Sequence, residues 1–124
     1  MTPEELQART KAFALAVIRL VSRLPRTEVA RVIGRQLLRA GTAVGANYRA
    51  ACRARSGADF RAKLAVVEEE ADESLYWLEL LAEAGIAAGP ALNSLLKEAD
   101  ELVAIFTSSR KTARDRNRGT GLTD

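Results

Sequence analysis

The sequence predicts an all-α protein that folds as an up-down-up-down four-helix bundle. Its 124 residues are enough for a single compact core. Apolar residues recur at spacings of three and four along four stretches, and breaks containing proline or glycine separate these stretches. Aromatic residues make up only 5% of the chain, so the side chains that favour β-sheets are scarce. Four amphipathic helices with short connections favour an antiparallel bundle.

The first predicted helix begins after Thr2, which can cap it, and ends before Pro25. The second begins at Thr27 and runs to about Arg53. Their inward-facing residues are Leu6, Phe13, Val17, Leu20 and Leu24 in the first helix, and Val29, Ile33, Leu37, Ala40, Val44, Tyr48 and Ala51 in the second. The second helix also contains the glycines Gly34, Gly41 and Gly45. Because each costs about 1 kcal/mol relative to alanine, we expect a neighbouring helix to approach closely there.

The third predicted helix begins at the capping sequence Ser56-Gly57-Ala58-Asp59, and the fourth follows a break between Gly85 and Pro90. Their inward-facing residues are Phe60, Leu64, Val67, Ala71, Leu75, Leu78 and Leu81, and then Leu92, Leu95, Leu96, Ala99, Leu102, Val103 and Phe106. From about Arg110 the sequence is polar and has no helical period. We therefore expect residues 1–109 to form the bundle and residues 110–124 to form a basic, disordered tail.

The chain has no histidine and a single cysteine, Cys52. These counts exclude histidine-based catalytic triads, a disulfide within the chain and a zinc site built from cysteines. Glu69 and Glu73 lie one helical turn apart and could hold a hard divalent cation or act as an acid/base pair. Carboxylates on one helix, however, are more often solvated or paired. We therefore expect no enzymatic activity, no cofactor and no metal site.

The sequence also bears on localisation. No apolar run approaches the roughly 20 residues that span a bilayer. The first residues include Glu4 and Glu5, where a secretory signal would carry basic side chains. We expect a cytoplasmic protein.

The net charge of +3 hides a strong segregation of charge along the chain. Residues 1–63 contain thirteen Lys or Arg and four acidic residues, whereas residues 64–109 contain ten acidic residues and one base, Lys97. In one interpretation, arginines of the second helix pair with acids of the third, within or between subunits. In the other, the surplus arginines form a phosphate-binding surface together with Arg9, Lys11, Arg19 and the tail. The two are compatible, because unpaired arginines can gather on one rim.

Trp77 and Asn47 each have two interpretations. Trp77 can pack at a helix or subunit interface or stack on a base, and packing is favoured because the chain has few aromatic residues. Asn47 lies close to the inner face of the second predicted helix, where a buried amide needs a hydrogen-bond partner. It would either fix the helix register or line a channel.

The middle of the chain resembles a known family. The segment Gln36–Ala51 reads Gln-Leu-Leu-Arg-Ala-Gly-Thr-Ala-Val-Gly-Ala-Asn-Tyr-Arg-Ala-Ala. It is similar to the signature of the bacterial four-helix-bundle family first noticed as reading frames inside intervening sequences of 23S ribosomal RNA genes. The pattern continues through Ser56, Asp59-Phe60, the acidic run Val67–Ser74 and Trp77-Leu78. The resemblance covers about residues 10–106.

The resemblance implies a bundle that assembles as a homopentamer around a central channel and has no enzymatic activity. A related branch is the accessory variability protein of diversity-generating retroelements, a basic pentamer that partners a reverse transcriptase and nucleic acid. The acidic third helix departs from that branch. A closed ring needs two complementary faces, which opposite charges on the second and third helices supply. The residues expected at the oligomer interface are Gly41, Gly45, Asn47, Glu69, Glu73 and Trp77.

The sequence thus predicts a non-enzymatic homo-oligomeric scaffold, with a pentamer favoured. It would bind RNA or another nucleic acid through Arg39, Arg49, Arg53 and Arg55. The alternative is a protein–protein interaction module that has no role in nucleic-acid binding, because pairing within the protein consumes its basic face. We expect neither a membrane nor a small-molecule substrate as a partner.

Overall fold

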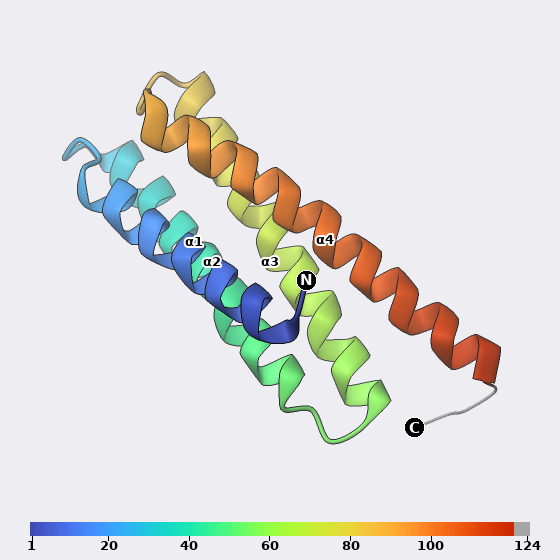
Figure 1. Cartoon of the computed structure of the whole chain (residues 1–124). Helices are drawn as coiled ribbons and strands as arrows, with labels where there is room; N and C mark the ends of the chain where they lie inside the picture. The colour runs from blue at the N-terminus through green and yellow to red at the C-terminus, as the bar shows by residue number, and fades with distance from the viewer. Residues whose placement is uncertain (121–124) are drawn as a thin grey trace.

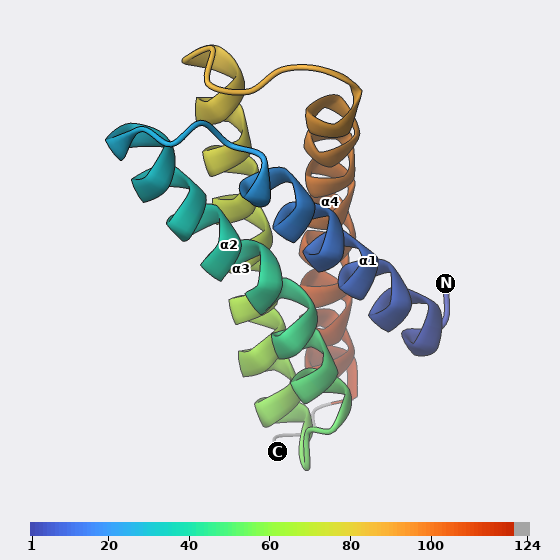
Figure 2. The same ribbon diagram turned by 90° about the vertical axis from the view of Figure 1, so that its left-hand side faces the viewer.

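The computed structural model of the protein describes residues 1–120, which form four α-helices (Figure 1). They are α1 (Pro3–Ser22), α2 (Glu28–Cys52), α3 (Gly57–Glu83) and α4 (Pro90–Thr120). Each helix packs against the next one in the chain, and α1 also contacts α4, so the four helices surround one core (Figure 2). The structure confirms the predicted all-α four-helix bundle.

Three helix starts are capped by the residues that the sequence indicated. The Thr2 hydroxyl accepts a hydrogen bond from the Glu5 amide at 3.1 Å, and the Glu5 carboxylate accepts one from the Thr2 amide at 3.1 Å. Thr27 and Ser56 each accept from the backbone amide three residues further on, at 3.2 and 3.0 Å. These bonds satisfy amides that have no partner within their helix and so fix where the helices begin.

The connection between α3 and α4 depends on two glycines. Gly85 and Gly89 have φ angles of 70° and 107°, in the left-handed region that side chains with a Cβ rarely adopt. The Ile86 amide donates to the Leu81 carbonyl at 2.9 Å and closes the end of α3. The chain therefore reverses over a few residues, and α4 runs antiparallel to α3.

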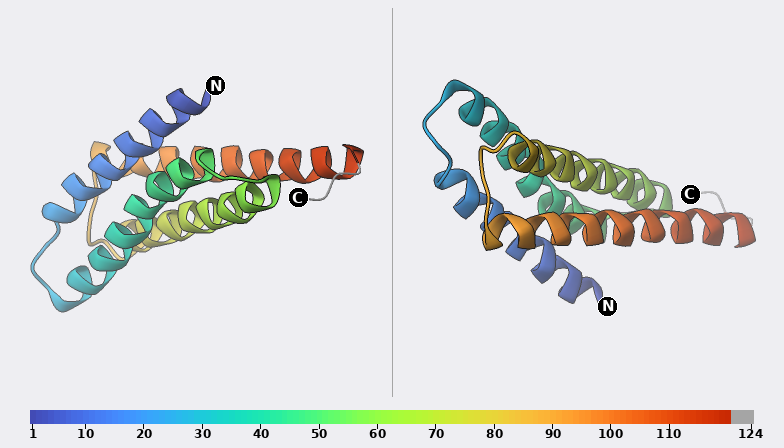
Figure 3. Two further views of the ribbon diagram at one scale, coloured as in Figure 1. Left: turned by 90° about the horizontal axis from the view of Figure 1, so that it is seen from below. Right: turned by 90° about the horizontal axis from the view of Figure 1, so that it is seen from above.

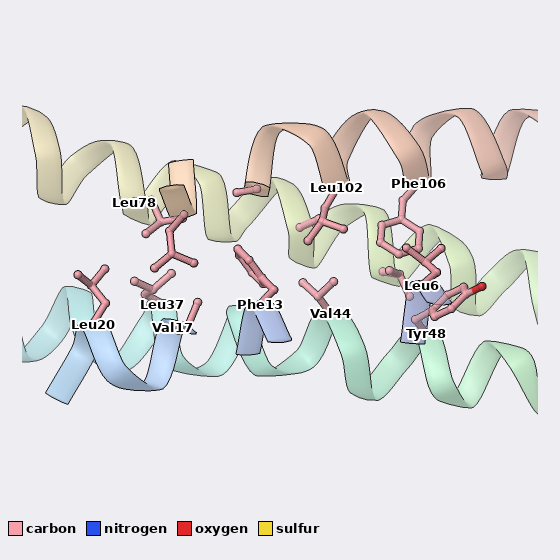
Figure 4. Close-up of a cluster of buried hydrophobic side chains, with 14 of the residues drawn as sticks. Leu6, Phe13, Val17, Leu20, Leu37, Val44, Tyr48, Leu78, Leu102 and Phe106 are labelled. Carbon is pink, nitrogen blue, oxygen red and sulfur yellow. The ribbon is translucent and has the colours of Figure 1, made fainter. Parts of the chain in front are cut away.

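The core is one continuous cluster to which all four helices contribute (Figure 4). Its largest fully buried side chains include Phe106, Leu37, Leu64, Leu78, Leu81, Leu92 and Leu102. The ring centroids of Tyr48 on α2 and Phe106 on α4 lie 5.4 Å apart. One predicted core position is wrong: Val29 is 58% exposed, and Ala30 is buried in its place. In the first turn of α2, the buried side of the helix therefore contains Ala30 and not Val29.

Each helix buries one side and exposes polar side chains on the other. Such one-sided burial is typical of helices that pack around a shared core in water. Consistent with this pattern, none of the helices in the described part of the chain is long and apolar enough to cross a membrane.

The glycines of α2 allow α1 to approach closely, as predicted. A Cβ added at Gly41 would lie 2.9 Å from Cγ2 of Val17, closer than carbon atoms pack. At Gly45 it would lie 3.3 Å from the backbone carbonyl atoms of Thr10. The contact between α1 and α2 therefore depends on the absence of side chains at these two positions.

The first helix diverges from the rest of the bundle (Figure 3). Its amino-terminal end points away from α4, and the contact between α1 and α4 is the smallest in the bundle. Arg9 links the two helices: its Nε and one terminal nitrogen each donate to a carboxylate oxygen of Glu98 at 2.7 Å. This two-point ion pair raises the pKa of Arg9, and hydrogen bonding to Glu98 is the largest cause.

The carboxyl-terminal part of the chain corrects a prediction. We expected the bundle to end at residue 109, but α4 continues to Thr120. Arg110 donates to the carboxylate of Glu68 on α3, and Thr107 donates to the same carboxylate at 3.1 Å. Lys, Arg and Ala also have high helix propensities, so the segment remains helical without an apolar face. Residues 121–124 of the predicted tail lie outside the described residues.

Candidate nucleic-acid interface

Basic side chains concentrate at the end of the bundle where α2 connects to α3. The five bases between residues 49 and 63 are Arg49, Arg53, Arg55, Arg61 and Lys63, and the one acid there is Asp59. The last turns of α4 extend past α1 towards the same end (Figure 1). They add Arg110, Lys111, Arg114 and Arg116. We call this region the basic end.

Three of the four predicted nucleic-acid residues lie at the basic end, in or just after the last turn of α2. Arg49, Arg53 and Arg55 are exposed. Within the described part of the chain, Arg49 and Arg53 form no ion pair, and Arg55 acts on Asp59 through its charge and backbone amide. Their guanidinium groups are therefore available to a phosphate, which they can contact with two parallel hydrogen bonds.

Arg39, the fourth predicted residue, is engaged elsewhere. Its guanidinium group donates to Glu70 at 3.1 Å and to Glu73, both on α3. This is the pairing of α2 with α3 that the charge pattern allowed, and it occurs within one subunit. The structure therefore does not group Arg39 with the arginines of the basic end.

Arg114 donates to the neighbouring Asp115 at 3.3 Å. Two other bases of this end are tied to acids of α3. Lys63 donates to Asp59, and the hydrogen bond lowers the pKa of that carboxyl. Arg110 donates to Glu68, whose pKa it lowers, and the pKa of Arg110 is raised in turn. These pairs keep both carboxylates ionised and position the bases, so they reduce the positive charge without removing it.

The predicted interface residues have several different environments. Gly41 and Gly45 face α1 of their own subunit, so the close approach there is intramolecular and does not place them at an interface between copies. Asn47 donates to the Ala43 carbonyl at 2.9 Å, within α2. Trp77 is half-buried, and its indole nitrogen donates to Glu73 at 3.1 Å.

Glu69 is the one residue of that predicted set that is exposed. Glu73 is occupied by Arg39 and Trp77, so the two carboxylates do not act as a pair. Among residues 1–120, no three carboxylate or thiol groups converge in the manner of a metal site. The acidic run of α3 thus has three parts: Glu68 binds α4, Glu70 and Glu73 bind Arg39 of α2, and Glu69 faces solvent.

Sequence reasoning assigned the bases of the tail to a phosphate-binding surface but missed that they lie on a helix. The segment that begins at Arg110 was expected to be disordered, because it lacks apolar periodicity. The signal that points to helix is its content of Lys, Arg and Ala, together with a carboxylate, Glu68, for Arg110 to bind. Lys11, which we expected to contribute to the phosphate-binding surface, lines a groove of about 330 Å³ between α1 and α2 together with Arg49.

The fold and this surface define a small all-α bundle with an arginine-rich end. The family model described as 23S rRNA-intervening sequence protein matches residues 4–108, and the chain belongs to that family. A crystal structure from Bacteroides thetaiotaomicron VPI-5482 is similar, with 32% sequence identity and a TM-score of 0.81. The similarity covers 90% of this chain and 99% of that one, which is described as a protein with unknown function from the S23 ribosomal protein family. The comparison with curated proteins gives no match.

Proposed function

We propose that this protein is a non-enzymatic, homo-oligomeric scaffold of the cytoplasm that binds RNA through its basic end. The observation that carries the proposal is the group of exposed arginines beside the α2–α3 connection: Arg49, Arg53 and Arg55. Of these, Arg49 and Arg53 form no ion pair within the described residues. A cluster of unpaired cations costs electrostatic free energy in the free protein, and a polyanion relieves that cost. RNA provides the phosphates, and released counterions add to the affinity.

Oligomerisation is supported by the faces that the subunit leaves unpaired. Glu69, Asp72 and Glu79 on α3 are exposed and form no ion pair within residues 1–117, and the same holds for Arg35 on α2. Apolar side chains accompany both sets, since Tyr76 of α3 is 53% exposed and Leu38 of α2 is 37% exposed. A contact of one copy's α2 face with the next copy's α3 face is heterologous, and such contacts close into rings. The proposed ring is a pentamer.

The test replaces Arg49, Arg53 and Arg55 by alanine and measures binding to single-stranded RNA over a range of salt concentrations. Each phosphate contact contributes about 0.7 to the slope of log affinity against log salt for single strands. Loss of three contacts should therefore lower the slope by about two and weaken binding at low salt.

A matched control removes the same number of charges at the opposite end of the bundle. Arg19, Arg23 and Arg26 are exposed there, near the connection between α1 and α2. Their replacement by alanine should leave the salt slope nearly unchanged. Equal effects of the two triple variants would show that net charge, not the basic end, determines binding, and would contradict the assignment.

The second candidate function is a protein–protein interaction module, and the pairing of Arg39 with Glu70 and Glu73 favours it. Native mass spectrometry of protein purified at low salt without nuclease separates the two functions. Five copies of the 13.4 kDa chain, about 67 kDa, with copurifying RNA would support the scaffold. A pentamer free of nucleic acid would favour the protein–protein module, and a monomer would contradict the oligomeric part of both.

A further inference from the structure

A hollow of about 570 Å³ opens at the basic end, where the divergent start of α1 leaves the surface of α2 and α3 uncovered. Its lining residues come from three helices and one connection. They are Pro3, Glu4 and Gln7 of α1, Tyr48, Ala51 and Cys52 of α2, Ala54 of the α2–α3 connection, and Phe60 of α3. The hollow therefore exists only because the tertiary fold brings residues 3–7, 48–54 and 60 together.

The inner wall of the hollow is aromatic and firmly held. Tyr48 is 7% exposed, and its ring packs against Phe106 with a centroid distance of 5.4 Å and an interplanar angle of 54°. Figure 4 shows the Tyr48 ring beside Leu6 and Phe106 at one end of the core cluster. Phe60, on α3, is half-buried and packs against the same core. Of the two rings, the half-buried Phe60 offers a flat group the larger apolar surface, because Tyr48 is almost fully buried. Rings held in this way lose little side-chain entropy on binding.

Polar groups lie at the rim on the α1 side. The amide of Gln7 can donate and accept hydrogen bonds, and the carboxylate of Glu4 can accept them. Within the described residues, neither side chain has a hydrogen-bond partner. Burial, together with the neighbouring Cys52 and Glu4, raises the pKa of Tyr48, whose hydroxyl is a hydrogen-bond donor at neutral pH. The rim thus combines donors and acceptors as the edge of a nucleobase does.

Arginines of the basic end lie next to the residues that line this hollow. Arg53 lies between the lining residues Cys52 and Ala54, and Arg55 follows directly. Gln7 also lines the neighbouring groove that contains Lys11 and Arg49. An aromatic recess with arginines at its edge fits a ligand that joins a flat heterocycle to a phosphate, and it does not fit a purely apolar partner, whose binding would leave these cations without an anion.

We propose that the hollow receives one unstacked base of a single-stranded RNA whose phosphates lie on Arg49, Arg53 and Arg55. The inference rests on the proposed function and specifies the form of RNA that the basic end takes. A base in a duplex is stacked and paired and cannot enter, whereas a base in a loop or a single strand can be splayed out onto aromatic rings. The protein should therefore prefer single strands to duplexes of equal phosphate count.

The test compares two single-stranded RNA oligonucleotides of equal length, one with all its bases and one with a central run of abasic sites. The complete strand should bind about tenfold more tightly, which is the effect expected of one stacked base. A 2-aminopurine at the central position should lose fluorescence on binding. Phe60→Leu, which keeps an apolar side chain against the core but removes the ring, should abolish both differences without changing the salt slope.

Tyr76→Leu is the matched control, because it replaces an exposed aromatic ring of the same helix outside the hollow. It should bind both strands as the unchanged protein does. Equal affinity for the two strands would contradict the proposal that the hollow binds a base. The proposed function would still hold in that case if the triple arginine variant lowers the salt slope. Failure of both strands to bind would overturn the proposed function as well. A change in oligomeric mass caused by Phe60→Leu would assign the hollow to a second copy of the chain and contradict its role in binding a base.

Discussion

Gly34, Gly41 and Gly45 all lie on the side of α2 that α1 covers, but they meet different atoms. A Cβ at Gly34 would touch Cδ1 of Leu24 at 3.0 Å, the far end of a flexible side chain. At Gly41 it would meet three atoms of the buried Val17, and at Gly45 the backbone of Thr10. Neither a buried β-branched side chain nor a helix backbone can move away easily.

Alanine substitutions should therefore divide these glycines into two groups. Gly41→Ala and Gly45→Ala should lower the free energy of unfolding by about 1–2 kcal/mol, because overpacking outweighs the gain in helix propensity. Gly34→Ala, the internal control, should be neutral or stabilising, since Leu24 can change rotamer. Denaturant unfolding followed by circular dichroism measures all three. A uniform gain in stability would show that α1 does not pack as closely as described.

Glu68 connects pH to stability through its bonds to Arg110 and Thr107. Hydrogen bonding to Arg110 lowers the pKa of this carboxyl from its ordinary value of 4.5. A carboxyl whose pKa is lower in the folded state stabilises that state above the unfolded pKa and loses this contribution as pH falls through the folded pKa. The contribution is thus complete near neutral pH and lost in acid.

Glu68→Gln should consequently be less stable than the unchanged protein at pH 7, and the difference should shrink as the pH falls below about 4.5. Thermal unfolding measured between pH 7 and pH 3 gives the comparison. Glu69→Gln serves as the control, because Glu69 is exposed and has no ion-pair partner among the described residues. A stability difference that does not change with pH would rule out the ion pair as its cause.

At the scale of the helices, α4 is the element that most needs a direct test. Removal of residues 110–124 eliminates the last turns of α4 but no residue of the hydrophobic core. The shortened chain should stay folded and lose roughly a tenth of its helical circular dichroism signal. Its RNA affinity should fall, and its salt slope should decrease, because Lys111 and Arg114 are lost.

Replacing Arg110 by alanine in the full-length chain is the control for that truncation. It removes the bond to Glu68 but keeps most of the charge of the segment. If the truncation changes neither the helical signal nor the salt slope, the last turns of α4 are neither formed in solution nor part of the basic end.

The four helices and their caps could be predicted because each depends on neighbours in sequence. Thr27 and Ser56 cap amides three residues away, and the apolar spacing of α3 follows from its own period. The end of α4 could not be predicted in this way, because Glu68 holds Arg110 from another helix. The exposure of Val29 could not be predicted for a related reason. The segments that pack against the first turn of α2, and not the sequence of α2 itself, decide which of its sides is buried.

The candidate site could also be predicted only where it depends on residues close together in sequence. Charge counting indicated Arg49, Arg53 and Arg55, which remain exposed. It could not distinguish them from Arg39, whose partners Glu70 and Glu73 lie more than thirty positions away in sequence and adjacent in space. The hollow between Gln7, Tyr48 and Phe60 has no sequence signal, since its residues come from three helices.

For the whole molecule, the arrangement of charge means that a single chain carries two patches of opposite charge at different places. The basic end lies beside the α2–α3 connection, whereas the exposed acids of α3 extend from Glu69 towards Glu83 along the same helix. Since the chain has no histidine, this charge distribution changes little between about pH 5 and pH 8. Binding and assembly that depend on it should be insensitive to pH across that range.

The divergence of α1 has a consequence for motion. A helix that is anchored mainly to one neighbour opens locally at a smaller free-energy cost than helices enclosed on both sides. Arg9 of α1 pairs with Glu98 and Glu101 of α4, and it lies two residues beyond Gln7. Backbone amides of α1 should therefore exchange with solvent deuterium sooner than those of α3. The wall of the hollow that residues 3–7 form can therefore move towards or away from a ligand, whereas the walls that α2 and α3 form stay fixed.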